Sequence, residues 1–554
     1  MLIDELKNQI EGDILTDDTT LKKYSTDASL FEVRPQIVIF PKNKEDIEKI
    51  LKTVNKENEN IGSGEKKYSV TIRSAGTCMA GGSLNDSIIL DVTKYINKLE
   101  KPDVEKKEVY FEPGLYYRDF EKELNKYGLM YPAFPASKDL CAMGGIIGNN
   151  GAGEKTLKYG KAENFIEELD TVLSDGSTAT FKEISIDEAR QKGEQDNLEG
   201  KIYKGILNII ENNEELIKSA KPKVSKNSAG YYIWNVLNRE KNTFDMTKLI
   251  VGSQGTLAMA TKAKMRLVDI PKEEGMLAVF FKNRSHLGQI VNLALKYDPE
   301  SVEAYDDKTV KLALKFWTGF IKKKGLFGAA KLGLSFIPEM IEMIKGGVPT
   351  LVMLVNFTSD NKNEIKEKID SLEYDLKAYK ELTEKEALTK AKAAKYWTIR
   401  HDAFALLREH MKERRTAPFI DDVIVPPEVF PEFLPKLEAL LDSYGLVYNI
   451  HGHAGNGNFH VIPLMDFHKK ENVDVVLELG DKVYDLVLSY GGSITAEHND
   501  GIIRTPYLKK QYSPEIISIF KEIKGIFDPQ SVLNPGKKVD GDVETIRKYI
   551  KIEK

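Results

Sequence analysis

The segment His451–His460 reads H-G-H-A-G-N-G-N-F-H, and it opens a stretch, residues 451 to 468, that holds four of the chain's eight histidines. Asn456-Gly457 favours a two-residue type I′ turn, since both residue types tolerate the positive φ that this turn needs. Such a turn would pair His453 directly with His460 on one face, with Cβ atoms roughly 5 Å apart. That separation suits two ligands of one metal ion.

A carboxylate and another imidazole follow downstream, in the segment A-E-H-N-D-G at residues 496–501. Two histidines and one carboxylate with an open position are a common ligand set for a catalytic divalent metal. Neighbouring residues of an extended chain point to opposite faces, so Glu497 and His498 can serve one site only if the backbone bends. The alternative is a hairpin whose histidines only form hydrogen bonds.

Length and composition limit the classes of protein to which the chain can belong. With 554 residues, 41% apolar and 30% charged, the chain is expected to form two or three globular domains. A formal net charge of −5 argues against a nucleic-acid-binding protein. Cys78 and Cys141 cannot hold an iron–sulfur cluster alone, and a reducing, cytoplasmic location fits them. Residues 1–10 predict an amphipathic helix without the apolar core of a signal peptide.

The order of predicted elements indicates α/β architecture. Strands are predicted at 38–40, 70–73, 88–91, 276–281 and 351–357, and a hairpin is predicted around Asp175-Gly176. Helices are predicted at 43–55, 361–374 and 384–396. Pro271 and the charged residues after it mark a boundary between two α/β parts.

Three glycine-rich segments follow or precede predicted strands: 73–83, 134–153 and 251–257. Successive backbone N–H groups in the first can form an anion site for a phosphate or pyrophosphate. The second carries almost no side chains from Gly144 to Gly153, which lets a flat ligand approach the backbone. A tight turn between strands is the other interpretation of the first segment, since it matches neither a Rossmann nor a Walker fingerprint.

Six motifs occur in the order seen in one family: R-S-A-G-T-C-M-A-G-G-S, P-A-S with G-G-I-I-G-N-N-G-A-G, V-G-S-Q-G-T-L, H-G-H-A-G-N-G-N-F-H, A-E-H and F-D-P-Q-S-V-L-N-P-G-K. The chain resembles the FAD-linked D-2-hydroxy-acid dehydrogenases of the vanillyl-alcohol oxidase/p-cresol methylhydroxylase flavoprotein fold. That family includes D-lactate dehydrogenases, glycolate oxidase subunits and D-2-hydroxyglutarate dehydrogenases. The resemblance implies an α+β fold, with a two-subdomain FAD-binding domain and an α/β substrate-binding cap domain. The expected ranges are an N-terminal helical segment 1–33, the FAD-binding domain 34–271, the cap 272–495 and a C-terminal segment 496–554 that completes the active site.

The resemblance also assigns site residues. Those expected to bind FAD are Arg73, Ser74, Ala75, Gly76, Thr77, Gly82, Ser83, Pro135, Ala136, Gly144, Gly145, Asn149, Gly151, Gly255, Thr256 and Asn534. His453, His460 and Glu497 match the ligands of a divalent metal, with zinc or manganese as the expected ion. His498 matches the catalytic base. Thr77 stands where some relatives carry a histidine bonded to the flavin, so a non-covalent FAD is expected. Cys141 could suggest a thioether to the flavin, but small buried packing is the favoured role.

Some residues depart from the family pattern. Asn456 stands where the turn usually has Asp, and Asn499 follows the catalytic histidine where Gly is common. Asn tolerates an unusual φ better than most residues, and backbone strain at Asn499 is the alternative. Arg400 matches a carboxylate-binding arginine, and a surface salt bridge on a helix is the alternative. Asp421 and Asp422 lie where relatives have lysine or tyrosine, and no role is predicted for them.

The expected reaction is FAD-dependent oxidation of a D-2-hydroxy acid to the 2-oxo acid. D-Lactate is the favoured substrate, with glycolate and D-2-hydroxyglutarate as the other candidates. His498 would take the hydroxyl proton, and the metal would polarise the substrate oxygen. An alkylglycerone-phosphate-synthase-like FAD-dependent transferase is the alternative on the same scaffold, and a non-enzymatic flavin or metal module is a third.

The electron acceptor is expected to be an electron-transfer flavoprotein, a quinone or oxygen, because the sequence shows no dinucleotide fingerprint for NAD. Residues 311–347 combine lysines with Phe316, Trp317, Phe320 and Phe327, the composition of an interfacial helix on anionic lipid. The segment therefore predicts peripheral contact with the inner membrane face. Core helices of the cap and a mobile lid are the alternatives.

Overall fold

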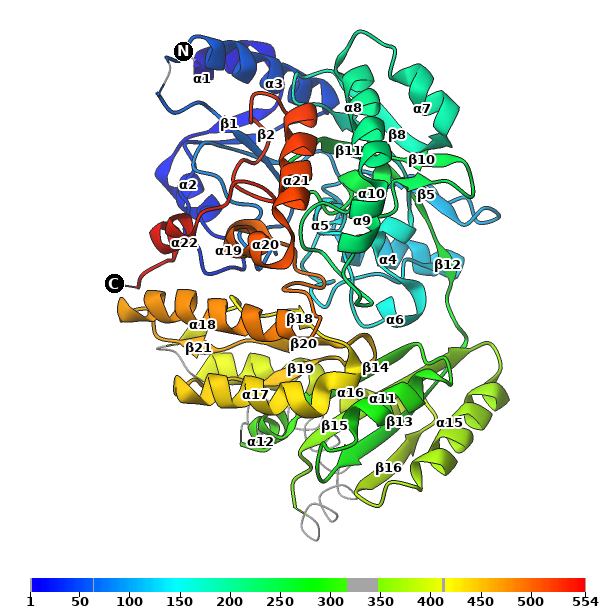
Figure 1. Cartoon of the computed structure of the whole chain (residues 1–554). Coiled ribbons are helices and arrows are strands. Elements are labelled where there is room, and N and C mark those ends of the chain that lie inside the picture. The colour runs from blue at the N-terminus through cyan, green and yellow to red at the C-terminus, as the bar shows by residue number, and fades with distance from the viewer. Residues whose placement is uncertain (1, 63, 316–346, 411–413, 554) are drawn as a thin grey trace.

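The computed structural model describes residues 2–62, 64–315, 347–410 and 414–553 (Figure 1). Its first sheet has the order β1–β2–β4–β3, formed by β1 (Asp13–Leu15), β2 (Ile37–Phe40), β3 (Val70–Arg73) and β4 (Ile88–Asp91). β4 is parallel to both β2 and β3, and β1 is antiparallel to β2. Helix α3 (Lys44–Glu59) makes the crossover from β2 to β3, as its 3.6-residue periodicity predicts.

A second sheet of six strands is antiparallel and has the order β5–β11–β7–β8–β10–β9. Its strands are β5 (Glu108–Phe111), β7 (Ile166–Val172), β8 (Thr178–Ser185), β9 (Leu237–Asn238), β10 (Thr243–Asp245) and β11 (Met259–Arg266). The hairpin predicted around Asp175-Gly176 is confirmed, since β7 pairs with β8 across it and Gly176 has a φ of 78°. The short strands β6 (Leu129–Met130) and β12 (Val268–Asp269) pair beside it.

The third sheet is antiparallel and belongs to residues after 271. Its order is β16–β13–β15–β14–β19–β20–β18, from β13 (Glu273–Phe281), β14 (Ser301–Asp306), β15 (Leu351–Ser359), β16 (Leu382–Ala387), β18 (Val423–Ile424), β19 (Ile450–His453) and β20 (Asn458–Val461). Alternate residues of β13 pack into different cores: Leu277 and Val279 on one face, Met276 and Ala278 on the other. Both faces are therefore covered, as the two-sided burial of β13 requires.

Helices cover the two faces of this sheet. One face carries α11 (Leu287–Leu295), α15 (Lys362–Leu376), α17 (Phe430–Ser443) and α18 (Glu471–Ser489), and the other carries α12 (Asp307–Lys315) and α16 (Lys390–His410). The helix predicted at 384–396 is wrong at its start. Residues 382–387 form the edge strand β16 against β13, and the helix begins only at Lys390. Pairing with an open sheet edge here outweighs the helical propensity of Glu384–Ala387.

The remaining helices lie before residue 251 or after residue 500. They are α1 (Leu2–Gln9), α2 (Asp18–Tyr24), α4 (Tyr117–Leu124), α5 (Met143–Asn149), α6 (Thr156–Tyr159), α7 (Ile186–Lys192), α8 (Leu198–Asn212), α9 (Glu214–Ala220), α10 (Thr247–Ile250), α19 (Gly501–Arg504), α20 (Leu508–Gln511), α21 (Pro514–Phe527) and α22 (Val543–Tyr549). β17 (Arg415–Thr416) pairs with β21 (Leu464–Met465). The predicted amino-terminal helix is confirmed as α1.

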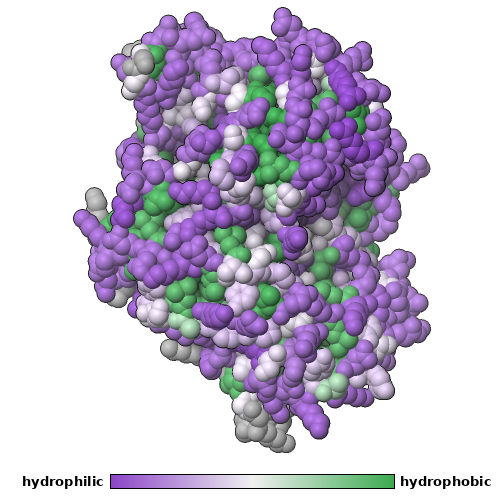
Figure 2. Space-filling model, viewed as in Figure 1, coloured by the Kyte–Doolittle hydropathy of each residue, from purple (hydrophilic) through white to green (hydrophobic). Residues whose placement is uncertain are grey.

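The carboxy-terminal segment returns to the amino-terminal half of the molecule. Figure 1 shows α19 to α22, in orange and red, among the blue and green elements, and α21 contacts α8. Leu533 forms a parallel bridge with Val70 of β3. Residues 496–502 contact both parts of the chain, because the N–H groups of residues 496–498 bind Asp422 and that of Gly501 binds Gln254. None of the helices in the described ranges combines the length and hydropathy needed to cross a membrane, and hydrophilic residues dominate the face in Figure 2.

Candidate active site

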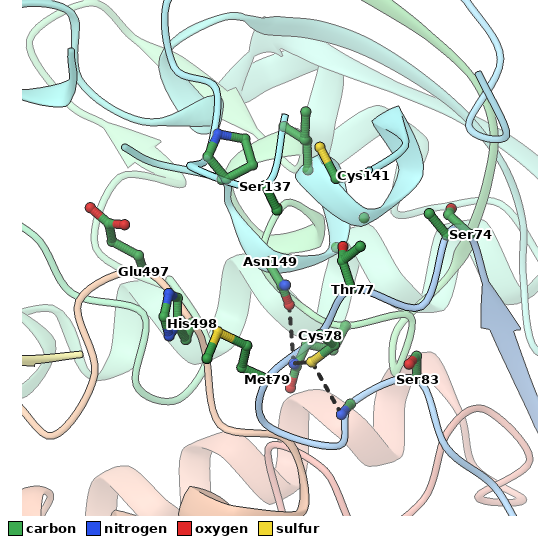
Figure 3. A pocket seen from close by; sticks show the side chains of 18 of the residues that line it. Ser74, Thr77, Cys78, Met79, Ser83, Ser137, Cys141, Asn149, Glu497 and His498 are labelled. Carbon is green, nitrogen blue, oxygen red and sulfur yellow. Dashed lines mark hydrogen bonds between the residues drawn. The ribbon is translucent and has the colours of Figure 1, made fainter. Parts of the chain in front are cut away.

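A cavity of about 440 Å³ lies where the glycine-rich segments of the amino-terminal half meet the histidine hairpin of the third sheet. Its wall combines the loop after β3, helix α5 and the segment 253–258 with histidines and carboxylates from residues 421 to 498. Figure 3 places Glu497 and His498 on one side of this cavity and Thr77 and Cys141 on the other. Motifs that are hundreds of residues apart in the sequence thus line one cavity.

The loop after β3 is fixed by Arg73, the last residue of that strand. Its guanidinium donates to the backbone carbonyls of Tyr24 and Thr26, at 3.3 and 2.9 Å. Gly76 lies directly against that guanidinium, because a Cβ there would be 2.3 Å from Nη2, and its φ of 68° favours glycine. The arginine therefore shapes the loop, and the loop's backbone faces the cavity.

Glycines of helix α5 leave the cavity floor bare. Gly144 packs closely on the neighbouring loops, since a Cβ there would be 2.5 Å from Ser74 Oγ and 2.8 Å from Pro113 Cβ. A Cβ on Gly145 would meet no protein atom within 4 Å, and one on Gly148 only Gln254 Cα at 3.8 Å. The space over these two glycines is therefore reserved for something other than protein, and it suits a flat cofactor such as FAD.

The predicted FAD-binding residues all line the cavity except Thr256 and Asn534. Asn534 donates from its amide to the backbone carbonyls of Gly82 and Gln254, at 2.9 and 2.7 Å, so it ties two wall segments together from behind. Thr256 is buried against Tyr231 and hydrogen-bonds its hydroxyl at 2.8 Å. Both residues support the wall without facing the cavity.

Cys141 also reaches the cavity wall, and it is buried. Burial raises the pKa of its thiol to about 12, and that of Cys78 to about 11, so neither is a thiolate at neutral pH. The packing role predicted for Cys141 is consistent with this burial.

The histidine hairpin differs from its predicted register. β19 and β20 pair His451 with His460 and His453 with Asn458, two residues away from the predicted pairing. A 3₁₀ turn over Ala454–Asn456 replaces the type I′ turn, because Gly457 has a positive φ of 83° but Asn456 does not. A slip of two residues keeps side chains on the same face. The His453 and His460 rings therefore still meet, with centroids 5.3 Å apart.

In three of the imidazoles, the Nδ1 atom lies next to a carboxylate oxygen. His453 Nδ1 lies 2.5 Å from Glu303 Oε1, His460 Nδ1 lies 3.1 Å from Asp421 Oδ1, and His498 Nδ1 lies 2.8 Å from Asp421 Oδ2. Histidines that bind metals typically have this partner on the second nitrogen, which leaves Nε2 as the ligand atom. The His460 and His498 rings are stacked with centroids 5.1 Å apart.

Charges within the cluster shift its protonation equilibria. Burial opposes charge on His498, but the carboxylates of Asp421 and Asp422 outweigh it and raise the pKa of the imidazole to about 9. Burial likewise opposes ionisation of Glu497, yet the charges of Lys226 and His453 hold its pKa well below the usual value. His498 is thus protonated at neutral pH in this arrangement. Its use as a proton acceptor needs a further positive charge nearby.

The backbone bend that the sequence requires at Glu497 and His498 has a specific cause. One oxygen of Asp422, Oδ2, accepts hydrogen bonds from three successive N–H groups, those of Ala496, Glu497 and His498, at 2.9, 2.8 and 2.7 Å. Chain that converges on one oxygen cannot stay extended, so both side chains reach the cavity. The φ of 68° at Asn499 agrees with the predicted unusual backbone there.

Arg400 lies on the cavity wall and not on the surface, since its side chain is 9% exposed. Its Nη2 and Nε are 3.1 and 3.2 Å from Glu303 Oε2. Burial alone would raise the pKa of Glu303, but the charges of His453, Arg400 and Lys226 lower it. Glu303 therefore joins the predicted carboxylate-binding arginine to a predicted metal ligand.

Several functional groups were missed by sequence reasoning: Lys226, Glu303, Asp421, Asp422 and His451. Charged residues inside apolar strands are a usable signal, and Glu303 in S-V-E-A-Y-D shows it. Lys226, in a coil, had no such signal.

A divalent cation fits the donor set. Donor atoms of Asp422, His460, Glu497 and His498 lie within 4.8 Å of one another. Asp422 is the least suitable of these, because Oδ2 accepts four hydrogen bonds and Oδ1 accepts one from Asn458. His453 Nε2 lies 3.4 Å from Glu497 Oε1. His453 is not one of those four residues, so the predicted set of His453, His460 and Glu497 stays a prediction.

Comparison with known families agrees with the cavity. Residues 35–182 match the family described as FAD binding domain, and residues 270–538 match the family described as FAD linked oxidases, C-terminal domain. The fold resembles that of 4-ethylphenol oxidase from Gulosibacter chungangensis (TM-score 0.70, 16% identity, 98% of this chain and 97% of that chain). It also resembles p-cresol methylhydroxylase (TM-score 0.66, 14% identity, 97% and 96%). These features define a flavoprotein of the vanillyl-alcohol oxidase fold.

The chain belongs to the FAD-linked oxidase family within that fold, as the predicted resemblance states. D-2-Hydroxyglutarate dehydrogenase of Haemophilus influenzae is 27% identical over 97% of this chain and 51% of its own length. Glycolate oxidase subunit GlcD of Bacillus subtilis is 24% identical over 96% and 95%, and D-lactate dehydrogenase of Archaeoglobus fulgidus is 26% identical over 91% and 91%. The chain spans about half the length of four of the D-2-hydroxyglutarate dehydrogenases that it matches, that of Haemophilus influenzae among them.

Proposed function

We propose that this protein oxidises a D-2-hydroxy acid to the 2-oxo acid with bound FAD. The observation that carries the proposal is the single cavity that joins the bare glycine floor of α5 to Arg400, His460 and His498. The names of the relatives, which are D-2-hydroxyglutarate dehydrogenase, D-lactate dehydrogenase and a glycolate oxidase subunit, support the same substrate class.

Arg400 and His498 have separate roles in the proposed reaction. Arg400 binds the substrate carboxylate through its planar guanidinium, which Glu303 holds at the wall. His498 accepts the hydroxyl proton at its Nε2, since its Nδ1 faces Asp421. The chemistry that FAD supplies when bound is acceptance of the hydride from the substrate α-carbon.

A divalent metal, zinc or manganese, is part of the proposal, with His453, His460 and Glu497 as ligands. Such an ion supplies Lewis-acid polarisation of the substrate oxygen and the positive charge that favours neutral His498. The carboxylate partners on Nδ1 of His453 and His460 support this assignment. We expect exhaustive chelation of the FAD-loaded protein, or His460→Ala, to abolish turnover with retention of FAD. Full activity after either treatment would contradict the metal role.

D-Lactate is the substrate that we propose first. Apart from histidines, the cations on the described cavity wall are Arg73, which is held by backbone carbonyls of the amino-terminal segment, and Arg400. One available guanidinium suits a substrate with one carboxylate. D-2-Hydroxyglutarate carries two, and among residues 2–62, 64–311, 347–400 and 414–553 the wall has no lysine or arginine besides these two.

The electron acceptor in this proposal is an electron-transfer flavoprotein or a quinone, and the site of action is the cytoplasm. The predicted membrane contact through 311–347 lies almost entirely outside the described residues, which end at 315 and resume at 347. It remains a prediction from composition alone.

The proposal is tested by product formation. FAD-loaded protein is incubated with an artificial electron acceptor and, in separate reactions, D-lactate, L-lactate, glycolate and D-2-hydroxyglutarate, and the 2-oxo acid is measured. We expect pyruvate from D-lactate at the highest kcat/KM and none from L-lactate. Absence of a 2-oxo acid from every substrate would refute the proposed class, and it would leave the transferase alternative open.

A further inference from the structure

A buried ion pair joins Lys226 to Glu497. Lys226 lies in the coil between α9 and β9, and its side chain is fully buried. Its ammonium contacts Oε1 of Glu497. Glu497 lines the cavity and Lys226 does not, so the ammonium reaches the carboxylate from the protein side.

Lys226 contacts the Glu497 oxygen that also lies close to His453. Glu497 Oε1 lies 3.4 Å from His453 Nε2, which is the ligand atom left free by the pairing of Nδ1 with Glu303. A cation shared by His453 and Glu497 would have this oxygen as its nearest carboxylate atom. Without such a cation, Lys226 and His453 supply the positive charge beside Glu497, and the Lys226 ammonium contacts the oxygen directly.

We propose that Lys226 is an internal counter-ion for Glu497 that competes with the divalent cation and so limits the affinity of the site for metal. The inference rests on the metal-binding part of the proposed function. Charges buried in a protein interior are screened weakly, so an ammonium beside a ligand carboxylate opposes a second cation there. The same ammonium stabilises the metal-free protein, because a buried carboxylate without a partner is costly. Metal is therefore exchangeable, and the empty site remains folded.

Metal affinity tests this role directly. FAD-loaded wild-type protein, Lys226→Met, Lys226→Gln and Lys226→Arg are stripped of metal and titrated with Zn²⁺ or Mn²⁺ against a chromophoric chelator. We expect the two neutral variants to bind either ion about 10-fold more tightly or more, which is the scale of effects from groups that contact metal ligands. Lys226→Arg keeps the charge and should stay within about 3-fold of wild type, since the competing cation remains. If Lys226→Met does not yield FAD-loaded protein, Lys226→Gln decides.

A matched control is available at another buried lysine–carboxylate pair. Lys538 Nζ lies 3.0 Å from Asp500 Oδ2, and both side chains are buried. Lys538→Met removes a comparable ion pair without touching a candidate ligand, so its metal affinity should equal that of wild type.

Equal or weaker metal binding in Lys226→Met and Lys226→Gln would overturn the proposal, because Lys226 would then only orient Glu497. Tighter binding in Lys538→Met as well would also overturn it, since the effect would not be specific to Glu497. No binding by any protein would refute both the metal site and this inference. Oxidation of a hydroxy acid is measured separately, so the fate of the proposed reaction stays distinguishable.

Discussion

Asp422 is the residue on which the shape of the active-site segment depends most. Its carboxylate is buried and accepts the N–H groups of Ala496, Glu497 and His498 on a single oxygen, while its own φ is 71°. The neighbouring Asp421 supplies the charge that both His460 and His498 face. Asp422 therefore sets the position of the reacting groups, and Asp421 makes the larger contribution of the two to the raised pKa of His498.

We expect Asp422→Ala to slow reduction of bound FAD by the hydroxy acid about 100-fold or more, because a shift of about 1 Å in a reacting group can cost that much. FAD should remain bound, since Asp422 is not part of the cavity wall. The measurement is anaerobic flavin absorbance after rapid mixing. Asp103→Ala is the control, because Asp103 also accepts a backbone N–H, from Lys106, but lies on the surface. An unchanged rate in Asp422→Ala would show that the bend does not depend on this carboxylate.

At the scale of elements, helix α5 offers a test of the cofactor site that is independent of catalysis. A Cβ on Gly145 or on Gly525 of α21 meets no protein atom within 4 Å, yet Gly145 lines the cavity and Gly525 does not. Gly145→Val should therefore fold as well as Gly525→Val but lose FAD, because its side chain fills the space over the helix. The flavin absorbance of each purified variant measures its FAD content, and its melting temperature shows whether it is folded. Normal FAD content in Gly145→Val would place the flavin elsewhere.

Acid precipitation of the wild-type protein adds a check on the same site. We expect the yellow flavin to stay in the supernatant, because Thr77 cannot bond to it and the Cys141 thiol has a pKa raised to about 12.

Asp306 joins three elements and predicts a pH dependence of stability. At the end of β14 it accepts Thr309 N–H of α12 on Oδ1 and Ile450 N–H of β19 on Oδ2. Burial raises the pKa of its carboxyl to about 6 from 3.8. The folded state therefore holds this proton more tightly than the unfolded state, and stability is lost as pH rises from about 4 to about 6, by about 3 kcal/mol for this group.

Asp306→Asn cannot ionise and escapes that loss. The free energy of unfolding of the variant, relative to wild type, should rise by about 2.4 kcal/mol between pH 4 and pH 7, because part of the loss in the wild type has already occurred at pH 4. The free-energy cost of placing the asparagine amide near Ile450 N–H is the same at every pH, so it cancels when the pH dependence is compared. Thermal unfolding of both proteins across that pH range measures it, and a difference that does not change with pH would contradict the raised pKa.

At the scale of the whole molecule, local patterns predicted much of the fold. β3 and β4 begin and end as predicted, because buried β-branched runs between turn residues leave few alternatives. The edge strand β16 was missed, since strand pairing at a sheet edge depends on a partner, β13, that lies a hundred residues away. Local propensity carries no information about such a partner.

The site was predictable in its residue types but not in its contacts. His453, His460 and Glu497 do converge, although the hairpin register is shifted by two residues. Lys226 and Asp421 were not predicted, because their importance arises only when distant segments fold together. The fold alone does not distinguish hydroxy-acid oxidation from the transferase alternative, because alkyldihydroxyacetonephosphate synthase has a TM-score of 0.65 with this chain at 15% identity.

Direct observation of flavin reduction separates the two chemistries and tests the central claim that one cavity unites FAD with a hydroxy-acid site. Wild-type protein and His498→Gln, both loaded with FAD and metal, are mixed anaerobically with D-lactate while flavin absorbance is recorded. The account predicts rapid bleaching in the wild type, none with L-lactate, and a rate about 10²- to 10⁴-fold lower in His498→Gln, the usual range for loss of a general base. Unbleached wild-type flavin with D-lactate, glycolate and D-2-hydroxyglutarate, or equal rates in the two proteins, would contradict it.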